Sequence, residues 1–173
     1  MNKFEKVSLE QFKKDTMEVI KNSPTIEDAE TFVKSIYEKI KLPQRATKGS
    51  AGYDFYSPFA FILNKDESII IPTGIRARLD KNKFLAIYPR SGHGFKYRSQ
   101  LDNTVGIIDS DYYYSSNEGH ILLKITCDSK TPGTKMNIEI GSGFAQGIIQ
   151  QYFTSIDDNA DSTRDGGIGS TDK

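Results

Sequence analysis

Two carboxylates stand close together in the stretch Asn103–Tyr112, which reads Asn-Thr-Val-Gly-Ile-Ile-Asp-Ser-Asp-Tyr. Asp109 ends an apolar run that is typical of a buried strand, and Asp111 is followed at once by the ring of Tyr112. A carboxylate at the end of a strand, beside an aromatic ring, can orient a water molecule over a bound ligand that contains a ring. From these residues alone, the alternative is an Asp-Ser-Asp turn that only ends a strand.

Two more stretches hold side chains suited to a polar ligand. In Pro89–Gly94, Arg90 offers a planar fork of donors, while Ser91 and Gly92 add a hydroxyl and an open backbone N–H. A polar loop is the alternative for this stretch. Gln146 interrupts an apolar strand, where a core hydrogen bond and a ligand contact explain it equally well.

The last residues of the sequence are polar and rich in glycine. Residues 164–171, Arg-Asp-Gly-Gly-Ile-Gly-Ser-Thr, could fold over phosphates through backbone amides, hydroxyls and a guanidinium, although the Gly-Lys-Ser/Thr of a P-loop does not occur. The alternative is a chain end without fixed structure. Earlier in the sequence, the glycine turn in Lys48–Phe55 leads into a strand that carries Asp54. Taken alone, this stretch indicates an ordinary turn.

Composition excludes several classes of protein. The sequence holds 23 basic and 23 acidic residues, and the zero net charge gives no general attraction to nucleic acids or anionic membranes. The single cysteine, Cys127, excludes an intrachain disulfide and fits a reducing compartment. His93 and His120 lack companion ligands, so we interpret both as loop residues and predict no metal cluster. Because neither a long apolar run nor a secretory signal occurs, we expect a cytoplasmic protein.

Helical spacing marks the first 40 residues. Ser8 and Gln11 form a capping pattern for a helix that runs to about Asn22. Apolar residues from Ala29 to Ile40 also recur at helical spacing, although the end of this segment could contain a strand. We predict a helical appendage over residues 1–40 that packs on the main body, with a surface for a partner protein as the alternative.

From Pro43 onward, short apolar runs alternate with turn residues, which predicts an all-β barrel or sandwich. We place this domain at residues 41–156 and a flexible tail at residues 157–173. The expected strands are Tyr53–Tyr56, Ser68–Ile71, Gly74–Leu79, Phe84–Tyr88, Val105–Ile108, Ile121–Thr126, Lys135–Ile140 and Ala145–Phe153.

Five stretches, in this order, resemble the five motifs of the trimeric deoxyuridine triphosphatase (dUTPase) family. Leu42–Asp54 is similar to the first motif and its approach, Pro89–Gly92 to the second and Asn103–Tyr112 to the third. Ala145-Gln146 is similar to part of the fourth, and Gly166–Thr171 to the fifth. Each stretch alone is unspecific, but five in register favour the resemblance over the alternatives given above.

The resemblance implies a mainly β, jelly-roll-like barrel that assembles as a homotrimer, with shared active sites that a neighbour's tail closes. It implies Mg²⁺-assisted hydrolysis of dUTP to dUMP and pyrophosphate, which keeps uracil out of DNA and supplies dUMP for dTMP synthesis. Asp109 would be the catalytic residue and would activate the water that attacks the α-phosphate. No direct protein ligand to the metal is expected, and Asp54 could reach it through water or orient Arg90.

The same resemblance implies how the substrate is held. Guanidinium, hydroxyl and amide groups would bind the phosphates, strand-edge backbone of a hairpin would pair with uracil, and a tyrosine ring would press on the deoxyribose. The implied substrate-binding residues are Arg90, Ser91, Gly92, Asn103, Gly106, Ile107, Ile108, Tyr112, Leu122, Gln146, Arg164, Ile168, Gly169, Ser170 and Thr171.

Several features depart from the family pattern. Ile168 stands where an aromatic ring usually stacks on uracil, and Gly143 where an arginine commonly precedes the Ala-Gln pair. Residues 113–118 lengthen the hairpin, and the first 40 residues have no counterpart in short family members. The changed tail and added helices motivate an alternative, a regulatory nucleotide-binding protein with weak catalysis. A dCTP deaminase shares the fold but uses a Glu in the region of Asp109.

Overall fold

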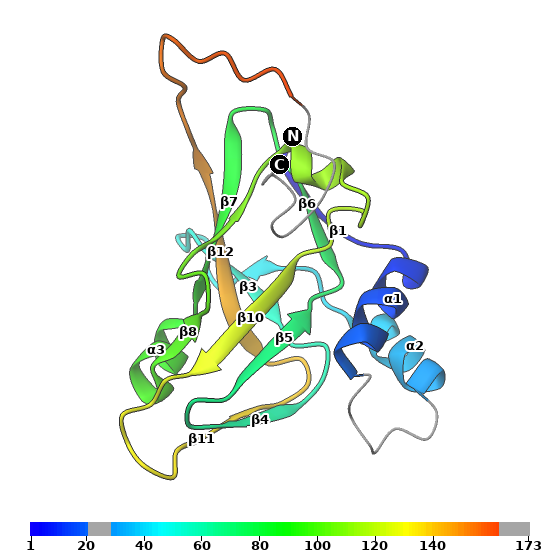
Figure 1. The fold of residues 1–173 in the computed structure, drawn as a ribbon, viewed down its shortest axis with the longest axis vertical. Helices are drawn as coiled ribbons and strands as arrows, with labels where there is room; N and C mark the ends of the chain where they lie inside the picture. The colour runs from blue at the N-terminus through cyan, green and yellow to red at the C-terminus, as the bar shows by residue number, and fades with distance from the viewer. Residues whose placement is uncertain (21–28, 163–173) are drawn as a thin grey trace.

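The computed structural model describes residues 1–20 and 29–162. The helices are α1 (Leu9–Ile20), α2 (Ala29–Lys39), α3 (Ser91–Tyr97) and the 3-10 helix η1 (Asp111–Tyr114). The strands are β1 (Lys3–Lys6), β2 (Gln44–Arg45), β3 (Tyr53–Tyr56), β4 (Phe61–Asn64), β5 (Ser68–Pro72), β6 (Ile75–Arg78), β7 (Lys83–Pro89), β8 (Ser99–Leu101), β9 (Gly106–Ile108), β10 (Leu122–Cys127), β11 (Lys135–Ile138) and β12 (Gly143–Gln151). The chain is mainly β, as the sequence predicts, and each expected strand overlaps an observed one (Figure 1).

Strand pairing divides the described chain into four antiparallel sheets. The largest has the order β2-β3-β12-β7-β9, and the next has the order β5-β10-β8. The pairs β1-β6 and β4-β11 complete the set. The described residues do not close the predicted jelly-roll-like barrel by hydrogen bonds, because closure needs a hydrogen-bonded neighbour on both sides of each strand. Strands such as β5 and β9 have a neighbour on one side only.

One hydrophobic core lies between the two larger sheets. Phe55, Leu85 and Phe144 reach it from the largest sheet, and Ile71 and Ile125 reach it from β5 and β10. All five side chains are almost fully buried. Burying a large apolar side chain contributes about 1.5–3 kcal/mol. Apolar burial therefore joins the sheets where hydrogen bonding between strands does not.

Helix α1 begins where the sequence predicts, and the predicted second helix is present over Ala29–Lys39. The Ser8 hydroxyl accepts a hydrogen bond from the Gln11 amide at 3.1 Å, which confirms the cap. Phe12 on α1 and Val33 on α2 are fully buried in the same core, so the helices cover one side of the sheets (Figure 1). The strand that the end of α2 could have contained is not formed. No helix in the described ranges has the length and apolar character of a membrane span.

Some elements differ from expectation. Ser91–Tyr97 is the helix α3, although Gly92 and Gly94 disfavour helix and the alternative for this stretch was a polar loop. The Gly94 amide donates to the Arg90 carbonyl at 2.9 Å and closes its first turn. His93 therefore lies in a helix, and the loop assignment is wrong. Strands β1, β2, β4 and β8 were not predicted, because short strands without long apolar runs leave little signal in a sequence.

Candidate active site

A pocket of about 410 Å³ lies where β3, β12 and the start of α3 meet. The sheet register creates it, because Gln146 on β12 stands opposite Asp54 on β3 and opposite Tyr88 on β7. Directly opposed residues share one face of a sheet. The structure thus brings Asp54, Arg90, Ser91 and Gln146 together from three separate motifs. The pocket is lined by Ala46, Ser50, Ala51, Gly52, Asp54, Arg90, Ser91, Gln146 and Ile148.

Arg90 is the cation of this pocket. Its Nε lies 3.2 Å from Oδ1 of Asp54, and its Nη1 donates to the Gly143 carbonyl at 3.2 Å. Arg90 is the extended residue between β7, which ends at Pro89, and α3, which begins at Ser91. These contacts engage Nε–H and one N–H of Nη1, and they leave the other guanidinium donors for an anionic ligand.

Two glycines allow the polar side chains to approach the backbone. A Cβ atom on Gly52 would lie 2.8 Å from Oε1 of Gln146. One on Gly143 would lie 2.7 Å from Nη1 and 3.2 Å from Cζ of Arg90. Sequence reasoning missed both functions, since it interpreted Gly52 as a turn residue and Gly143 as a departure from the family pattern. Their nearness to the motifs was the only signal available.

Helix α3 adds further groups beside Arg90. Ser91 and Gly92 are exposed in its first turn, and Ser91 lines the pocket. His93 is half-buried on the same helix. Burial lowers the pKa of His93, and the positive charge of Arg90 lowers it further. His93 is therefore neutral near pH 7 and adds no charge to the site.

The predicted catalytic residue stands in a different part of the chain from this pocket. Asp109 is half-buried between β9 and η1, and its carbonyl accepts a hydrogen bond from the Tyr112 amide at 3.3 Å. An Asp-Ser-Asp turn is therefore present, and it is compatible with a catalytic function. None of the pocket-lining residues comes from the hairpin Asn103–Leu122.

The hairpin presents an edge of the largest sheet. Strand β9 pairs with β7 and ends the strand order, so one edge of Gly106–Ile108 has no strand beside it in the described chain. Gly106 is buried and Ile107 is exposed, while Asn103 is exposed before the strand and Leu122 opens β10. The arrangement leaves strand-edge backbone available to a planar ligand.

Tyr112 is buried rather than displayed on the surface. Only 8% of the residue is exposed, and its hydroxyl donates to the His120 carbonyl at 2.8 Å. The amide of Asn117 donates to the same hydroxyl oxygen at 2.8 Å. His120, predicted as an ordinary loop residue, lies between η1 and β10 but is fully buried. The buried Cys127 at the end of β10 agrees with the sequence.

The predicted tail residues cannot be placed in the site. Arg164, Ile168, Gly169, Ser170 and Thr171 lie outside the described residues.

Metal-binding side chains are sparse around the pocket. Residues 1–20 and 29–162 contain no group of three or more acidic, histidine or cysteine side chains that could hold a metal ion. Mg²⁺ usually keeps several waters and binds one or two carboxylates together with substrate phosphates. One carboxylate, Asp54, lines the pocket and is already paired with Arg90. These residues fit a metal that is held mainly by a bound polyphosphate and water.

A family model described as dUTPase matches residues 38–172 of this chain. The chain belongs to the dUTPase family. The deoxyuridine 5'-triphosphate nucleotidohydrolase of Lactococcus lactis subsp. lactis is 34% identical over 135 residues, which cover 76% of this chain and 88% of that protein.

Solved structures of dUTPases share the fold of this chain. A dUTPase from Streptococcus mutans is 30% identical, with a TM-score of 0.58 over 66% of this chain and 88% of that chain. A dUTPase from phage phi11 of S. aureus, whose structure shows the coordination of a structural Mg(II) ion, is 20% identical. It shares the fold with a TM-score of 0.59 over 72% of this chain and 92% of that chain.

The match to the dUTPase family begins inside α2, so β1 and α1 precede it. This N-terminal segment is nevertheless built onto the family fold. Strand β1 pairs with β6 from Lys3 opposite Arg78 to Lys6 opposite Ile75. The segment predicted as purely helical therefore also adds a strand.

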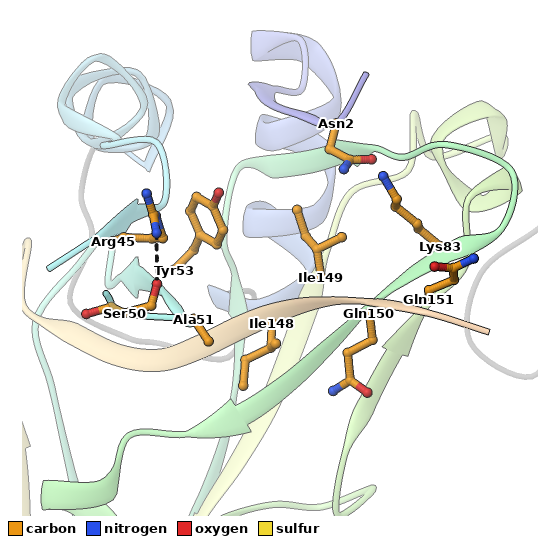
Figure 2. Close-up of a pocket in the computed structure, with 10 residues that line it drawn as sticks. All are labelled: Asn2, Arg45, Ser50, Ala51, Tyr53, Lys83, Ile148, Ile149, Gln150 and Gln151. Carbon is orange, nitrogen blue, oxygen red and sulfur yellow. Dashed lines mark hydrogen bonds between the residues drawn. The ribbon is translucent and has the colours of Figure 1, made fainter. Parts of the chain in front are cut away.

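A second pocket, of about 440 Å³, borders the first and shares Ser50, Ala51 and Ile148 with it. Figure 2 shows the hydrogen bond from Arg45 to the Ser50 carbonyl, which is 3.1 Å long, and it shows Lys83 on the opposite side of the pocket. Arg45 also donates to the Lys48 carbonyl at 2.9 Å, and Lys83 lies 2.8 Å from Asp80. Both cations are already held within the chain. The first pocket joins residues of three family motifs, whereas only the first motif stretch contributes to the second pocket.

Proposed function

We propose that this chain hydrolyses dUTP to dUMP and pyrophosphate, and so keeps uracil out of DNA while supplying dUMP for dTMP synthesis. The observation that carries the proposal is the pocket in which Arg90, Asp54 and Gln146 meet from three family motifs. A guanidinium, a hydroxyl and an amide around one cavity suit the oxygens of a polyphosphate. Membership of the dUTPase family supports dUTP as the substrate.

We assign the activation of water to Asp109. The water oxygen forms a bond to the α-phosphorus, and its proton passes to the carboxylate of Asp109. The bond from the α-phosphorus to its bridging oxygen breaks, and pyrophosphate leaves. The turn between β9 and η1 fixes the backbone of Asp109, which supports this function because the attacking water must be aimed.

Hydrogen-bond donors and a cation would stabilise the negative charge of the phosphates. Arg90, Ser91, Gly92 and Gln146 would bind phosphate oxygens, and Asp54 would hold Arg90 in place. Mg²⁺, when bound, would neutralise phosphate charge. Asp54 could also reach the waters of the metal.

The hairpin would select the base and the sugar. Backbone groups of Gly106, Ile108 and Leu122 would pair with uracil, with Ile107 between them on the edge strand β9 and Asn103 holding a water or neighbouring backbone. Thymine would have no room for its methyl group, and cytosine would present a donor in the wrong place. Tyr112 would exclude a 2′-hydroxyl. A site discriminates strongly against a nucleotide whose binding would leave the polar groups of the site unpaired.

We infer that copies of the chain complete one another's sites in a homotrimer. The pocket contains no residue of the hairpin, which supports an assembly in which a second copy supplies it. The tail residues Arg164 and Ile168 to Thr171 would close over a neighbour's site and exclude water. The domain order that we propose is an N-terminal appendage over residues 1–40, the catalytic domain over 41–156 and the tail over 157–173.

Pyrophosphate release from dUTP, dTTP, dCTP and UTP in parallel, with Mg²⁺, tests this proposal. We expect turnover of dUTP alone. In Asp109→Asn, which keeps the shape but not the base, turnover should fall by roughly 10²–10⁴-fold. Binding of dUTP by the same variant would show that the site is still formed.

Folded protein that releases no pyrophosphate from any of the four nucleotides would contradict the proposal. Tight binding of dUTP without turnover would favour the regulatory alternative. Full activity in Asp109→Asn would leave hydrolysis in place but would remove Asp109 from the mechanism.

A further inference from the structure

Two features that the family pattern does not explain contact each other. One is the N-terminal segment (residues 3–37), which precedes the family match. The other is the lengthened loop (residues 113–118), which begins within η1 and lies near the start of the chain (Figure 1). Three attachments join the N-terminal segment to this loop and to His120 just after it. Each attachment uses one carboxylate.

Glu118 receives the first attachment. The Ser8 amide and hydroxyl donate to its two carboxylate oxygens at 2.8 and 2.6 Å. In the second attachment, the Tyr113 hydroxyl donates to Glu5 at 2.6 Å. The Arg76 guanidinium lies 4.5 Å from the Tyr113 ring centroid, between the two carboxylates. These contacts are partly exposed, so each contributes modestly.

The third attachment is the buried one. His120 is 0% exposed, and the Gly74 amide donates to its Nε2 at 2.8 Å. An accepting Nε2 carries no proton, so the ring proton is on Nδ1 and is donated to Oδ2 of Asp15 at 2.5 Å. Gln11 donates to the same oxygen at 2.8 Å. Both ring nitrogens are thus held, and the imidazole has one orientation.

His120 connects this attachment to the substrate hairpin. Its carbonyl accepts the Tyr112 hydroxyl at 2.8 Å, while its amide donates to Asn117 at 3.1 Å. A displacement of His120 would therefore displace the ring of Tyr112. A lengthened loop costs more entropy to order than a tight turn, so it needs support from outside itself. In this chain α1 provides that support through Asp15.

We propose that Asp15 and His120 are positioning residues, through which the N-terminal segment fixes the Tyr112 ring and thereby the sugar end of the substrate site. The proposal rests on the proposed function, because it takes Tyr112 as the contact to deoxyribose. Asp15 is not among the residues that line the candidate pocket. It acts through the ring and the carbonyl of His120.

The test compares three variants of the full chain by kcat and KM for dUTP and UTP. Asp15→Ala removes the acceptor, Asp15→Asn keeps an oxygen that can accept from Nδ1, and Glu18→Ala removes an exposed carboxylate from the same helix. For Asp15→Ala we expect KM for dUTP to rise roughly 5- to 30-fold, kcat to stay within about threefold, and the preference for dUTP over UTP to fall about tenfold. Asp15→Asn should recover most of the preference, and Glu18→Ala should match the native chain.

Backbone hydrogen exchange gives a readout that does not depend on activity. Residues 111–122 should exchange faster in Asp15→Ala than in Asp15→Asn or Glu18→Ala. A purely structural role would lower kcat through loss of folded protein and would leave KM and the nucleotide preference unchanged. That result, or unchanged exchange in residues 111–122, would overturn the proposal.

If Asp15→Ala does not fold, Gln11→Ala decides the question, because Gln11 donates to the Asp15 oxygen that binds His120. We expect it to raise KM for dUTP by roughly 2- to 5-fold, and an unchanged KM would overturn the proposal. A native chain that hydrolyses no nucleotide would instead contradict the proposed function. In that case, exchange in residues 111–122 alone decides whether Asp15 holds the loop.

Discussion

The pocket around Arg90 and the hairpin of residues 103–122, for which we propose phosphate and nucleoside binding, are supported in different ways. The pocket is held within the family fold, by strand register at Gln146 and by the ion pair of Arg90 and Asp54. The hairpin is held from outside that fold, since Asp15 lies before the family match and binds the ring of His120. One region therefore has its support in the motifs, and the other has it in a segment that no motif marks.

Under the proposed function, this difference would separate the binding of phosphate from the recognition of the nucleoside. A change in the pocket should affect every nucleotide alike, because all triphosphates present the same oxygens. A change in the hairpin support should affect the choice between nucleotides. The predictions below test this separation.

The largest effect is expected in the pocket. Arg90→Ala removes the guanidinium and leaves Asp54 without its ion-pair partner. We expect kcat/KM for dUTP to fall roughly 10²–10³-fold, with the residual preference for dUTP over UTP unchanged. Steady-state kinetics with both nucleotides measures this. Lys96→Ala, which removes an exposed cation from the adjacent helix α3, is the control. A changed preference in Arg90→Ala would mean that the two regions are not separable.

A smaller effect is expected from the backbone beside Arg90. Gly143→Ala places a Cβ 2.7 Å from Nη1 of Arg90, so the flexible guanidinium that is paired with Asp54 must shift. We expect kcat/KM to fall about tenfold, which corresponds to about 1.4 kcal/mol.

A double-mutant cycle checks the cause of that loss. If Gly143 acts through Arg90, adding Gly143→Ala to Arg90→Ala should cause little further loss. Two fully additive losses would show instead that the glycine serves the sheet rather than the guanidinium.

The smallest effect concerns stability in acid. Burial disfavours the charged form of Asp15, but hydrogen bonds from His120 and Gln11 outweigh it, so its pKa lies below the ordinary value. The stabilisation is therefore complete above the unfolded-state pKa of about 3.9 and is lost as the pH falls through the lower folded-state value. The charge-assisted hydrogen bonds contribute roughly 1–3 kcal/mol.

Urea unfolding of the native chain and of Asp15→Asn, at pH values from 7 down to 3, measures this contribution. The variant should be less stable at neutral pH, and the difference should shrink as the pH falls. A difference that stays constant, or grows in acid, would contradict the assignment of a charged Asp15.

Local signals in the sequence predicted much of the fold. Apolar runs between turn residues gave the positions of the longer strands, and Ser8 with Gln11 gave the start of α1. They did not give α3, where the residues after Arg90 form a helix in spite of two glycines. Propensity is a weak prior that tertiary packing overrides. Pairing of strands was also beyond reach, because register depends on contacts between residues far apart in the sequence.

The sequence by itself determined the residue types of the candidate site, since a guanidinium, hydroxyls, an amide and carboxylates in motif order are visible without coordinates. Only the tertiary structure decided how they are held. It showed that Gly143 makes room for Arg90, and that His120, apparently a loop residue, is buried against Asp15 from the N-terminal segment. Asp15 and His120 are separated by 105 positions in the sequence, so no local pattern could show that they pair. A local pattern reports only what neighbouring residues favour, whereas a buried pair forms only when the whole chain has packed around it.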